Sequence, residues 1–133
     1  GTKLASTQPE FSALQLAPLE DGTLDWCQET GAAALIWSPL AGGRLGEGYV
    51  PQPDDPARLA DIHAALDRIA AQQEARRSDV ALAFVLKHPA RPVVLLGTQT
   101  PARLKAAVRA LDIELSRQDW YSILEASRGA PMP

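Results

Sequence analysis

Two short motifs in the chain suit the binding of a flat, anionic ligand. Trp37 is followed by Ser-Pro-Leu-Ala-Gly-Gly-Arg, so an aromatic ring precedes a turn whose glycines admit a ligand close to the backbone. Further along, Gly97-Thr98-Gln99-Thr100-Pro101 combines hydroxyls with a helix start, and Arg103 follows in that helix. Helix N-termini bind anions, and arginine can add a charge-assisted bond to a phosphate. Taken singly, the motifs also fit a core tryptophan with a tight turn and a capped helix with a solvated arginine.

The other reactive residue types form no recognisable cluster. His63 falls in the polar part of an amphipathic helix and His88 precedes a proline. Neither has a second ligand at metal spacing, so we expect no metal site and interpret both histidines as structural or solvated. Cys27 has no histidine partner and is expected to be a small buried hydrophobic residue. Asp54 and Asp55 are expected in a solvated loop.

Composition excludes several classes of protein. The 133 residues are 46% apolar and 22% charged, as in an ordinary globular domain. The net charge of −3 argues against nucleic acid or an anionic membrane as the main partner. No apolar run approaches the roughly 20 residues of a membrane helix, and the first residues do not resemble a signal peptide. A single cysteine favours a reducing compartment, so we expect a cytoplasmic protein.

Three apolar runs predict short strands: 4–11, weakened by Pro9, then 33–37 and 93–96. The second and third are apolar on both faces, which is typical of buried parallel strands. Segment 38–56 is rich in glycine and proline and has no periodicity. Long loops of this kind often bind ligands, so we expect a cofactor or substrate loop.

The remaining segments predict helices. One spans 22–29 and is closed by Gly31. Another begins near Pro56, a third runs from a Ser78 cap to about His88, and a fourth starts at Thr100. Segment 80–86 could also be a strand, but its alanine and leucine content favours helix. The expected buried faces of two of these helices are Leu59, Ile62, Leu66 and Ile69, and Leu104, Val108 and Leu111. A last helix is expected to begin at a Ser116–Asp119 capping box, to have Trp120, Ile123 and Leu124 on its apolar face, and to end at Gly129.

Strands that alternate with helices predict βαβ units and a parallel sheet. Ligands in such folds gather at the carboxyl ends of the strands, which here are 8–12, 37–44 and 97–103. Both ligand-binding motifs therefore fall where an α/β protein carries its site.

Together, the segments 8–12, 35–43 and 96–104 resemble the sixth, seventh and eighth strand ends of the aldo-keto reductases. Segment 111–116 and Asp119-Trp120 are similar to the entry of that family's final helix. The resemblance covers essentially all 133 residues. It implies an α/β fold, the C-terminal half of a (β/α)8 TIM barrel, with residues 1–133 as a single partial domain. It also implies an NADP(H)-dependent oxidoreductase that reduces aldehydes or ketones.

The resemblance assigns cofactor-binding roles to individual residues. Gln8 would bind the nicotinamide carboxamide and Trp37 would stack on the nicotinamide ring. The pyrophosphate would lie along Ser38, Leu40 and Gly42, with Arg44 nearby. The adenosine end would meet Gly97, Thr98, Gln99 and Arg103.

The family's catalytic tyrosine, lysine, aspartate and histidine lie on the first four strands of its barrel, and no segment here matches them. We therefore assign no catalytic residue and expect the chain alone to be inactive. Tyr49, in the long loop, is a candidate for binding only, and Tyr121 for packing. The chain is expected to self-associate or to pair with an N-terminal half-barrel.

Two alternatives remain open. One is a non-catalytic half-barrel that serves as a binding or assembly module. The other treats 57–75 and 79–88 as a DNA-binding helix-turn-helix, which the acidic balance disfavours.

Overall fold

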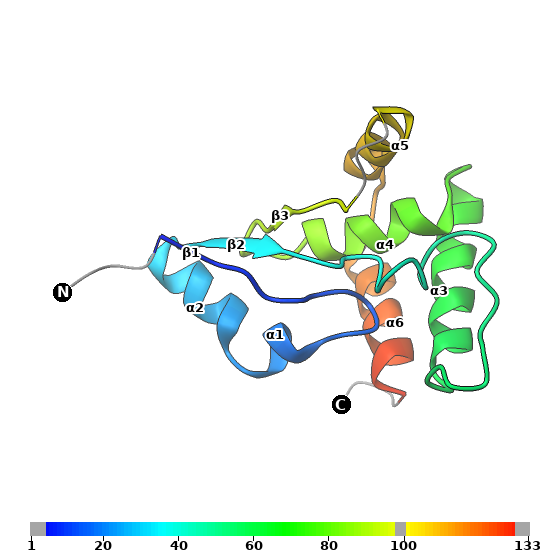
Figure 1. The fold of residues 1–133 in the computed structure, drawn as a ribbon, viewed down its shortest axis with the longest axis horizontal. Coiled ribbons are helices and arrows are strands. Elements are labelled where there is room, and N and C mark those ends of the chain that lie inside the picture. The colour runs from blue at the N-terminus through cyan, green and yellow to red at the C-terminus, as the bar shows by residue number, and fades with distance from the viewer. Residues whose placement is uncertain (1–4, 98–100, 130–133) are drawn as a thin grey trace.

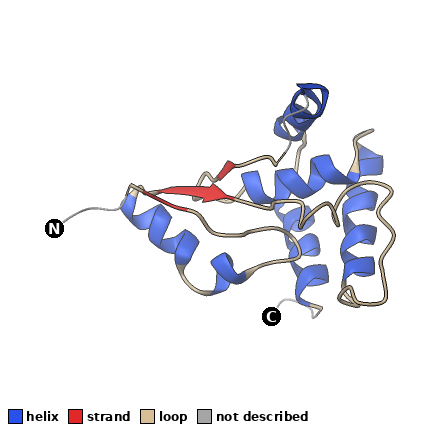
Figure 2. Ribbon diagram, in the orientation of Figure 1, coloured by secondary structure: helices blue, strands red, loops and turns tan. Residues whose placement is uncertain are grey.

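Three short parallel strands form the central sheet of the computed structural model, which describes residues 5–97 and 101–129 (Figure 1 and Figure 2). β1 (Ser6–Thr7) pairs with β2 (Ala33–Ile36), and β2 pairs with β3 (Val93–Val94). Because both pairings are parallel, the carboxyl ends of the strands lie at one edge of the sheet. The predicted parallel α/β arrangement is confirmed.

The first strand is shorter than the predicted segment 4–11. Its ladder stops at Thr7, because Pro9 has no N–H to donate. A single parallel bridge between Glu10 and Trp37 continues the pairing beyond Pro9. The side chain of the next residue, Phe11, is fully buried in the core. Leu4 lies outside the described residues.

The third strand is not the buried central strand that its apolar sequence predicts. The backbone of Leu95 continues the ladder by donating to the carbonyl of Ile36 at 2.8 Å, yet Val93 is 52% exposed and Leu95 41% exposed. β3 is an edge strand of the three-stranded sheet. Val94 packs against the core, whereas the side chains of Val93 and Leu95 are left exposed on the sheet.

Two helices connect β1 to β2 and lie together on one side of the sheet in Figure 1. α1 (Ala17–Glu20) is a single turn that the sequence did not predict. α2 (Thr23–Thr30) ends at Gly31, whose φ of 75° is the left-handed conformation expected of a C-terminal glycine. Cys27 is buried as predicted, and this burial raises the pKa of its thiol.

α3 (Leu59–Gln72) buries the apolar stripe that its periodicity predicts, since all four predicted positions are fully buried against α4 and α6. His63, which periodicity places in the polar part of this helix and which we expected to be structural or solvated, is structural. Its side chain is buried, and Nε2 lies 2.7 Å from the carbonyl oxygen of Arg44. The loop 38–56 packs against this helix at Arg44, so a position that periodicity places on the polar face is covered by the loop.

α4 (Arg77–Leu86) runs through the middle of the molecule, with every residue from 78 to 85 buried. The predicted Ser78 cap is wrong. Arg76 occupies the N-cap position, and its backbone N–H donates to Oδ2 of the buried Asp79 at 2.9 Å. Nη2 of Arg76 also donates to Oδ1 of that carboxylate at 2.8 Å. Ser78 is consequently free to contact the long loop.

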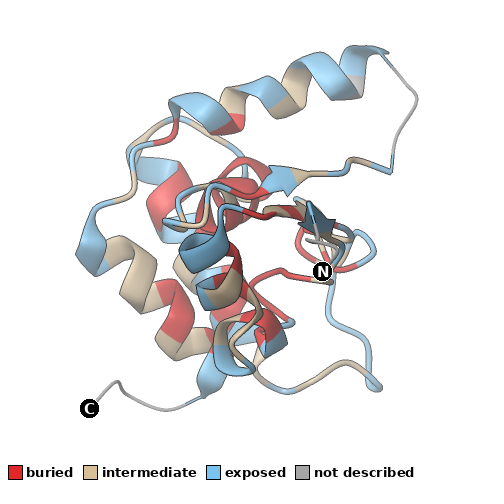
Figure 3. Ribbon diagram, turned by 90° about the vertical axis from the view of Figure 1, so that its left-hand side faces the viewer, coloured by how far each residue is buried: buried red, intermediate tan, exposed pale blue. Residues whose placement is uncertain are grey.

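α5 (Pro101–Ala107) projects from the body of the molecule in Figure 1, and the 3-10 helix η1 (Val108–Asp112) that follows it packs against α4. Their predicted buried stripe is wrong, because Leu104, Val108 and Leu111 are 40%, 57% and 63% exposed. In Figure 3, this helix crosses the top of the view and is mostly pale blue and tan. Nothing in the described part of the chain covers its apolar face.

α6 (Arg117–Arg128) begins and ends as predicted. The hydroxyl of Ser116 accepts from the N–H of Asp119 at 3.0 Å, and Gly129 follows the last turn with a φ of 73°. Trp120 packs its ring on Phe84, with centroids 4.8 Å apart, and donates its indole N–H to the Phe84 carbonyl at 2.9 Å. This contact joins the last helix to the core. Among helices of the described ranges, none has both the length and the apolar character required to cross a membrane.

Candidate functional site

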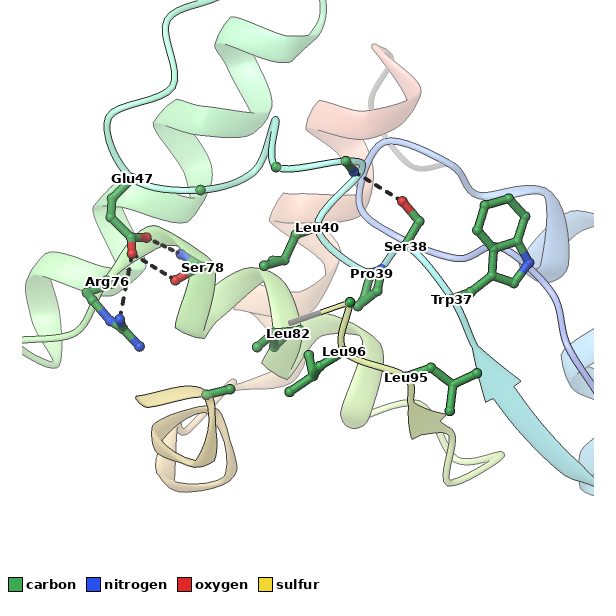
Figure 4. A pocket seen from close by; sticks show the side chains of 15 residues that line it. Trp37, Ser38, Pro39, Leu40, Glu47, Arg76, Ser78, Leu82, Leu95 and Leu96 are labelled. Atoms are coloured by element: carbon green, nitrogen blue, oxygen red, sulfur yellow. Dashed lines mark hydrogen bonds and ion pairs between the residues drawn. The ribbon is translucent and has the colours of Figure 1, made fainter. Parts of the chain in front are cut away.

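A cavity of about 1050 Å³ opens at the carboxyl ends of β2 and β3 (Figure 4). Its volume is at the upper end of those of small-molecule sites, roughly 300–1,000 Å³. Three parts of the chain form its walls: the segment after β2, the start of α4, and the residues after β3 with the end of α5. The lining residues are Trp37, Ser38, Pro39, Leu40, Gly42, Gly43, Gly46, Glu47, Arg76, Ser78, Leu82, Leu95, Leu96, Gly97 and Ala107.

Trp37 presents its ring at the edge of the sheet. Its backbone N–H donates to the carbonyl of Pro9 at 3.2 Å, and its indole N–H donates to the carbonyl of Gln8 at 3.1 Å. The first bond anchors the backbone and the second orients the ring, while 47% of the residue stays exposed. A large aromatic that is held in place and half exposed provides a rigid surface for stacking. Gln8, whose carbonyl accepts this bond, is itself exposed.

The turn after Trp37 has an unusual backbone. Ser38 and Ala41 have φ values of 52° and 54°, and Gly42 and Gly43 have 67° and 90°. Left-handed conformations at residues other than glycine are strained and are concentrated at functional sites. The Ser38 hydroxyl accepts from the Gly42 N–H at 3.1 Å and so closes the turn. The turn brings a hydroxyl and two glycines to the cavity wall.

Arg44 does not line the cavity. Its Nε donates to the carbonyl of Ala41 at 2.9 Å, and Nη1 lies 3.6 Å from Oδ1 of Asp55. The Tyr49 hydroxyl also donates to Asp55, at 2.9 Å, as does the Gln52 N–H at 2.8 Å. The Asp55 side chain is only 8% exposed, so the expectation that this residue is solvated is wrong. Instead it ties together the far part of the long loop.

These bonds shift the pKa values of both partners in this network. The hydrogen bond to the Asp55 carboxylate raises the pKa of Tyr49. The Gln52 N–H, then Tyr49 and Arg44, lower the pKa of Asp55 against the opposing effect of burial. Asp55 therefore stays ionised and Tyr49 stays protonated around neutral pH.

A carboxylate and a guanidinium stand together at the end of the cavity opposite Trp37 (Figure 4). Glu47 accepts from the N–H and the hydroxyl of Ser78, each at 3.1 Å, and Nη1 of Arg76 lies 3.8 Å from Oε1. Burial opposes ionisation of Glu47, but the bonds from Ser78 and the charge of Arg76 outweigh it and lower the pKa. The sequence did not predict that Glu47, Arg76 and Ser78 belong to the site, because their proximity depends on how the long loop crosses the start of α4.

The second predicted motif is only partly described. Gly97 follows β3 and lines the cavity. Thr98, Gln99 and the Thr100 cap lie outside the described residues, as does the side chain of Arg103, whose backbone belongs to α5.

Five of the ten predicted cofactor-binding residues meet at one cavity. They are Trp37, Ser38, Leu40, Gly42 and Gly97. Two others, Gln8 and Arg44, do not line the cavity but contact residues at it. The Gln8 carbonyl accepts from the Trp37 indole, and Arg44 donates to the carbonyl of Ala41 in the turn. The cavity combines an aromatic face, a strained glycine turn and a charged end, which suits an elongated polar ligand with a flat ring. No group of three metal-binding side chains occurs within residues 5–97 and 101–129.

Comparisons with known proteins agree with this architecture. The sequence profile of the Aldo/keto reductase family matches residues 1–128. The chain is 41% identical over 133 residues to a 6-dehydroglucose reductase of Novosphingobium aromaticivorans, covering 100% of this chain and 42% of that protein. It is 33% identical over 132 residues to the oxidoreductase YdhF of Escherichia coli, covering 98% and 41% of the two chains. The chain thus spans about two-fifths of the length of these relatives.

Solved structures show the same fold. The aldo-keto reductase AKR11C1 from Bacillus halodurans, in its apo form, superposes with a TM-score of 0.76 at 21% sequence identity, over 98% of this chain and 46% of that one. Its holo form superposes with a TM-score of 0.74 at 21% identity, over 96% and 44%. The chain therefore belongs to the aldo/keto reductase family, and it folds as the C-terminal half of a (β/α)8 barrel.

Proposed function

We propose that this chain is the cofactor-binding half of an NADP(H)-dependent oxidoreductase that reduces aldehydes or ketones. The observation that carries the proposal is the Trp37 ring, oriented by the bond from its indole N–H to the Gln8 carbonyl and half exposed at the end of a cavity of about 1050 Å³. Relatives named as reductases and oxidoreductases support it. In this proposal residues 1–133 are a single partial domain of a cytoplasmic enzyme, and segment 38–56 is its cofactor or substrate loop.

The lining of the cavity fits a nicotinamide dinucleotide. Trp37 would stack on the nicotinamide, with the amide of Gln8 beside it, and the turn at Ser38, Leu40 and Gly42 would follow the pyrophosphate. The Ser38 hydroxyl accepts the Gly42 N–H, so its own proton is available to a phosphate oxygen. Gly97, Thr98, Gln99 and Arg103 would hold the adenosine end, and Arg44 would act indirectly, by bracing the loop. When bound, such a cofactor supplies the hydride.

Replacement of Trp37 by alanine is expected to weaken binding of NADPH to the chain by about 1–3 kcal/mol, the usual value for aromatic stacking on a base. Isothermal titration calorimetry measures it directly. Trp37→Phe keeps a flat ring and is the matched control, expected to bind nearly as well as the wild type. If Trp37→Ala binds NADPH as tightly as the wild type, Trp37 is not the stacking residue.

The non-catalytic half-barrel remains a second candidate, because the structure has an uncovered apolar surface. Val93 and Leu95 of the edge strand and Leu104, Val108 and Leu111 of α5 and η1 are 40–63% exposed. Unpaired strand edges and contiguous apolar patches promote association. In either function, we expect the partner to be a second copy of the chain or an N-terminal half-barrel.

The chain at micromolar concentration is expected to form dimers or larger assemblies in light scattering. The double variant Val108→Lys/Leu111→Lys should increase the monomer fraction, because it places charges in the apolar surface. Val50→Lys is the matched control, since Val50 is 67% exposed but lies in the long loop. A wild-type chain that stays monomeric and folded would show that this surface needs no partner.

A further inference from the structure

We propose that a second site, a pocket between the end of α4 and the start of α6, binds a small aromatic carboxylate. The proposed function of the cavity does not use this pocket. Its volume is about 390 Å³, within the lower part of the range for small-molecule sites. The lining residues that carry the argument are Lys87, His88, Ser116, Arg117, Trp120 and Tyr121.

The pocket is separate from the cavity beside the strand ends. Ser78 and Leu82 of α4 line the cavity, whereas Lys87 and His88, just beyond the last residue of that helix, line the pocket. The ten residues of α4 correspond to a length of about 15 Å. Pro89 also lines the pocket and leads into β3, so the pocket lies toward the amino end of that strand. A ligand here therefore occupies a site of its own.

Two aromatic rings form one wall of the pocket. The rings of Trp120 and Tyr121 are nearly perpendicular, at 87°, with centroids 5.5 Å apart. Trp120 is held in place, because its ring stacks on Phe84 and its indole N–H donates to the Phe84 carbonyl. Both residues are only partly buried. A planar ligand ring can pack against this wall in the offset or edge-to-face geometries that aromatic pairs prefer.

The charged groups of the pocket are cations. Lys87 and Arg117 are both exposed, and the described lining residues include no aspartate or glutamate. The guanidinium of Arg117 lies 5.6 Å from the ring centroid of Tyr121, so a positive charge stands beside the aromatic wall. The chain as a whole has a net charge of −3, which makes this group of cations a local exception. An ammonium and a guanidinium bind a carboxylate through charge-assisted hydrogen bonds.

Two neutral groups of the pocket are also donors. Nδ1 of His88 accepts from the N–H of Ala90 at 3.0 Å. Burial lowers the pKa of His88 against the opposing charge of Asp25, so the ring is neutral near pH 7 and carries its proton on Nε2. The Ser116 hydroxyl accepts from the N–H of Asp119, so its own proton is available to a ligand. Cations and neutral donors beside aromatic rings complement a flat ring that carries a carboxylate.

The test is titration of the isotope-labelled chain with 2-naphthoate, followed by the indole N–H signals of Trp37 and Trp120 in two-dimensional NMR. These tryptophans line the cavity and the pocket, respectively. We expect the Trp120 signal to shift and to saturate with a dissociation constant of about 1 mM, the affinity usual for a ligand of this size. The Trp37 signal should stay in place.

Two further probes separate the ring from the charge. The uncharged analogue 2-naphthalenemethanol keeps the ring, and acetate keeps the carboxylate. Each is expected to bind about tenfold more weakly than 2-naphthoate, since each lacks one of the two interactions. Equal affinity for either probe would overturn the proposal of an aromatic carboxylate.

The double variant Lys87→Gln/Arg117→Gln removes both cations and should weaken 2-naphthoate about tenfold. Lys105→Gln/Arg128→Gln is the matched control. It loses the same two types of charge outside the pocket, in α5 and at the opposite end of α6, and should keep the wild-type affinity.

Three other results would overturn the inference: a Trp120 signal that does not respond to 2-naphthoate, a response confined to Trp37, or equal weakening in both double variants. Binding of NADPH to the cavity is measured separately and does not enter this test. Failure of the pocket and failure of the proposed function are therefore distinguishable.

Discussion

The 133-residue chain alone is expected to show no NADPH-dependent reduction of an aldehyde or ketone. Hydride transfer to a carbonyl needs a proton donor at the carbonyl oxygen, and a positioned general acid contributes roughly 10²–10⁴-fold to the rate. Among the described residues that line the cavity, Glu47 and Arg76 are the titratable ones. The lowered pKa of Glu47 leaves it ionised, and the carboxylate of Asp79 raises the pKa of Arg76, so neither donates a proton near neutral pH.

The two tyrosines of the chain do not supply the missing acid. Tyr49 donates its proton to Asp55, an interaction that raises its pKa. Tyr121 packs edge-on against Trp120, and the guanidinium of Arg117 lies 5.6 Å from its ring centroid. Neither tyrosine lines the cavity.

Loss of NADPH absorbance with a panel of aldehydes and ketones measures the activity. A complete aldo-keto reductase assayed in parallel is the positive control, and the buffer blank sets the expected rate of the chain. Turnover that increases in proportion to the chain concentration would contradict the prediction. It would show that a group other than Glu47, Arg76 and the two tyrosines delivers the proton to the carbonyl oxygen.

Replacement of Phe84 by alanine is expected to lower the free energy of unfolding by about 3–5 kcal/mol, the usual range for a buried phenylalanine. The ring is fully buried, stacks on Trp120 at 4.8 Å and contacts Phe11 at 5.9 Å between centroids. Its loss would leave a cavity between α4, α6 and the segment after β1. Urea unfolding followed by circular dichroism measures the change.

Leu111→Ala is the matched control for this variant, since its side chain is 63% exposed and its truncation should change stability by no more than about 0.5 kcal/mol. Should Phe84→Ala cost no more than the control, the centre of the core would have to relax around the lost ring. If self-association buries Leu111, Leu111→Ala would also lower stability by weakening the assembly. Both variants are therefore compared at a concentration where the wild type is monomeric.

The sequence by itself determined the elements whose cause is local. The stripe of Leu59, Ile62, Leu66 and Ile69 requires only helical periodicity, and it is fully buried. Gly31 and Gly129 end their helices because a left-handed residue is needed at that point. The order of the main strands and helices follows from the same local patterns. Trp37 and Gly97 lie at one edge of the sheet because each follows a strand and the strands are parallel.

Tertiary structure decided what depends on neighbours distant in sequence. An apolar stripe predicts a face to be covered, but it cannot say whether a covering layer is present, so Leu104 and Val108 are exposed despite their spacing. The sequence predicts that Asp55 is solvated, but the folded loop buries its carboxylate beside Arg44. Glu47 and Ser78 are 31 residues apart, and only the crossing of the loop over the start of α4 brings them into hydrogen-bonding distance. Hydrogen bonds and ion pairs act over a few ångströms, so their partners are set by packing rather than by sequence spacing.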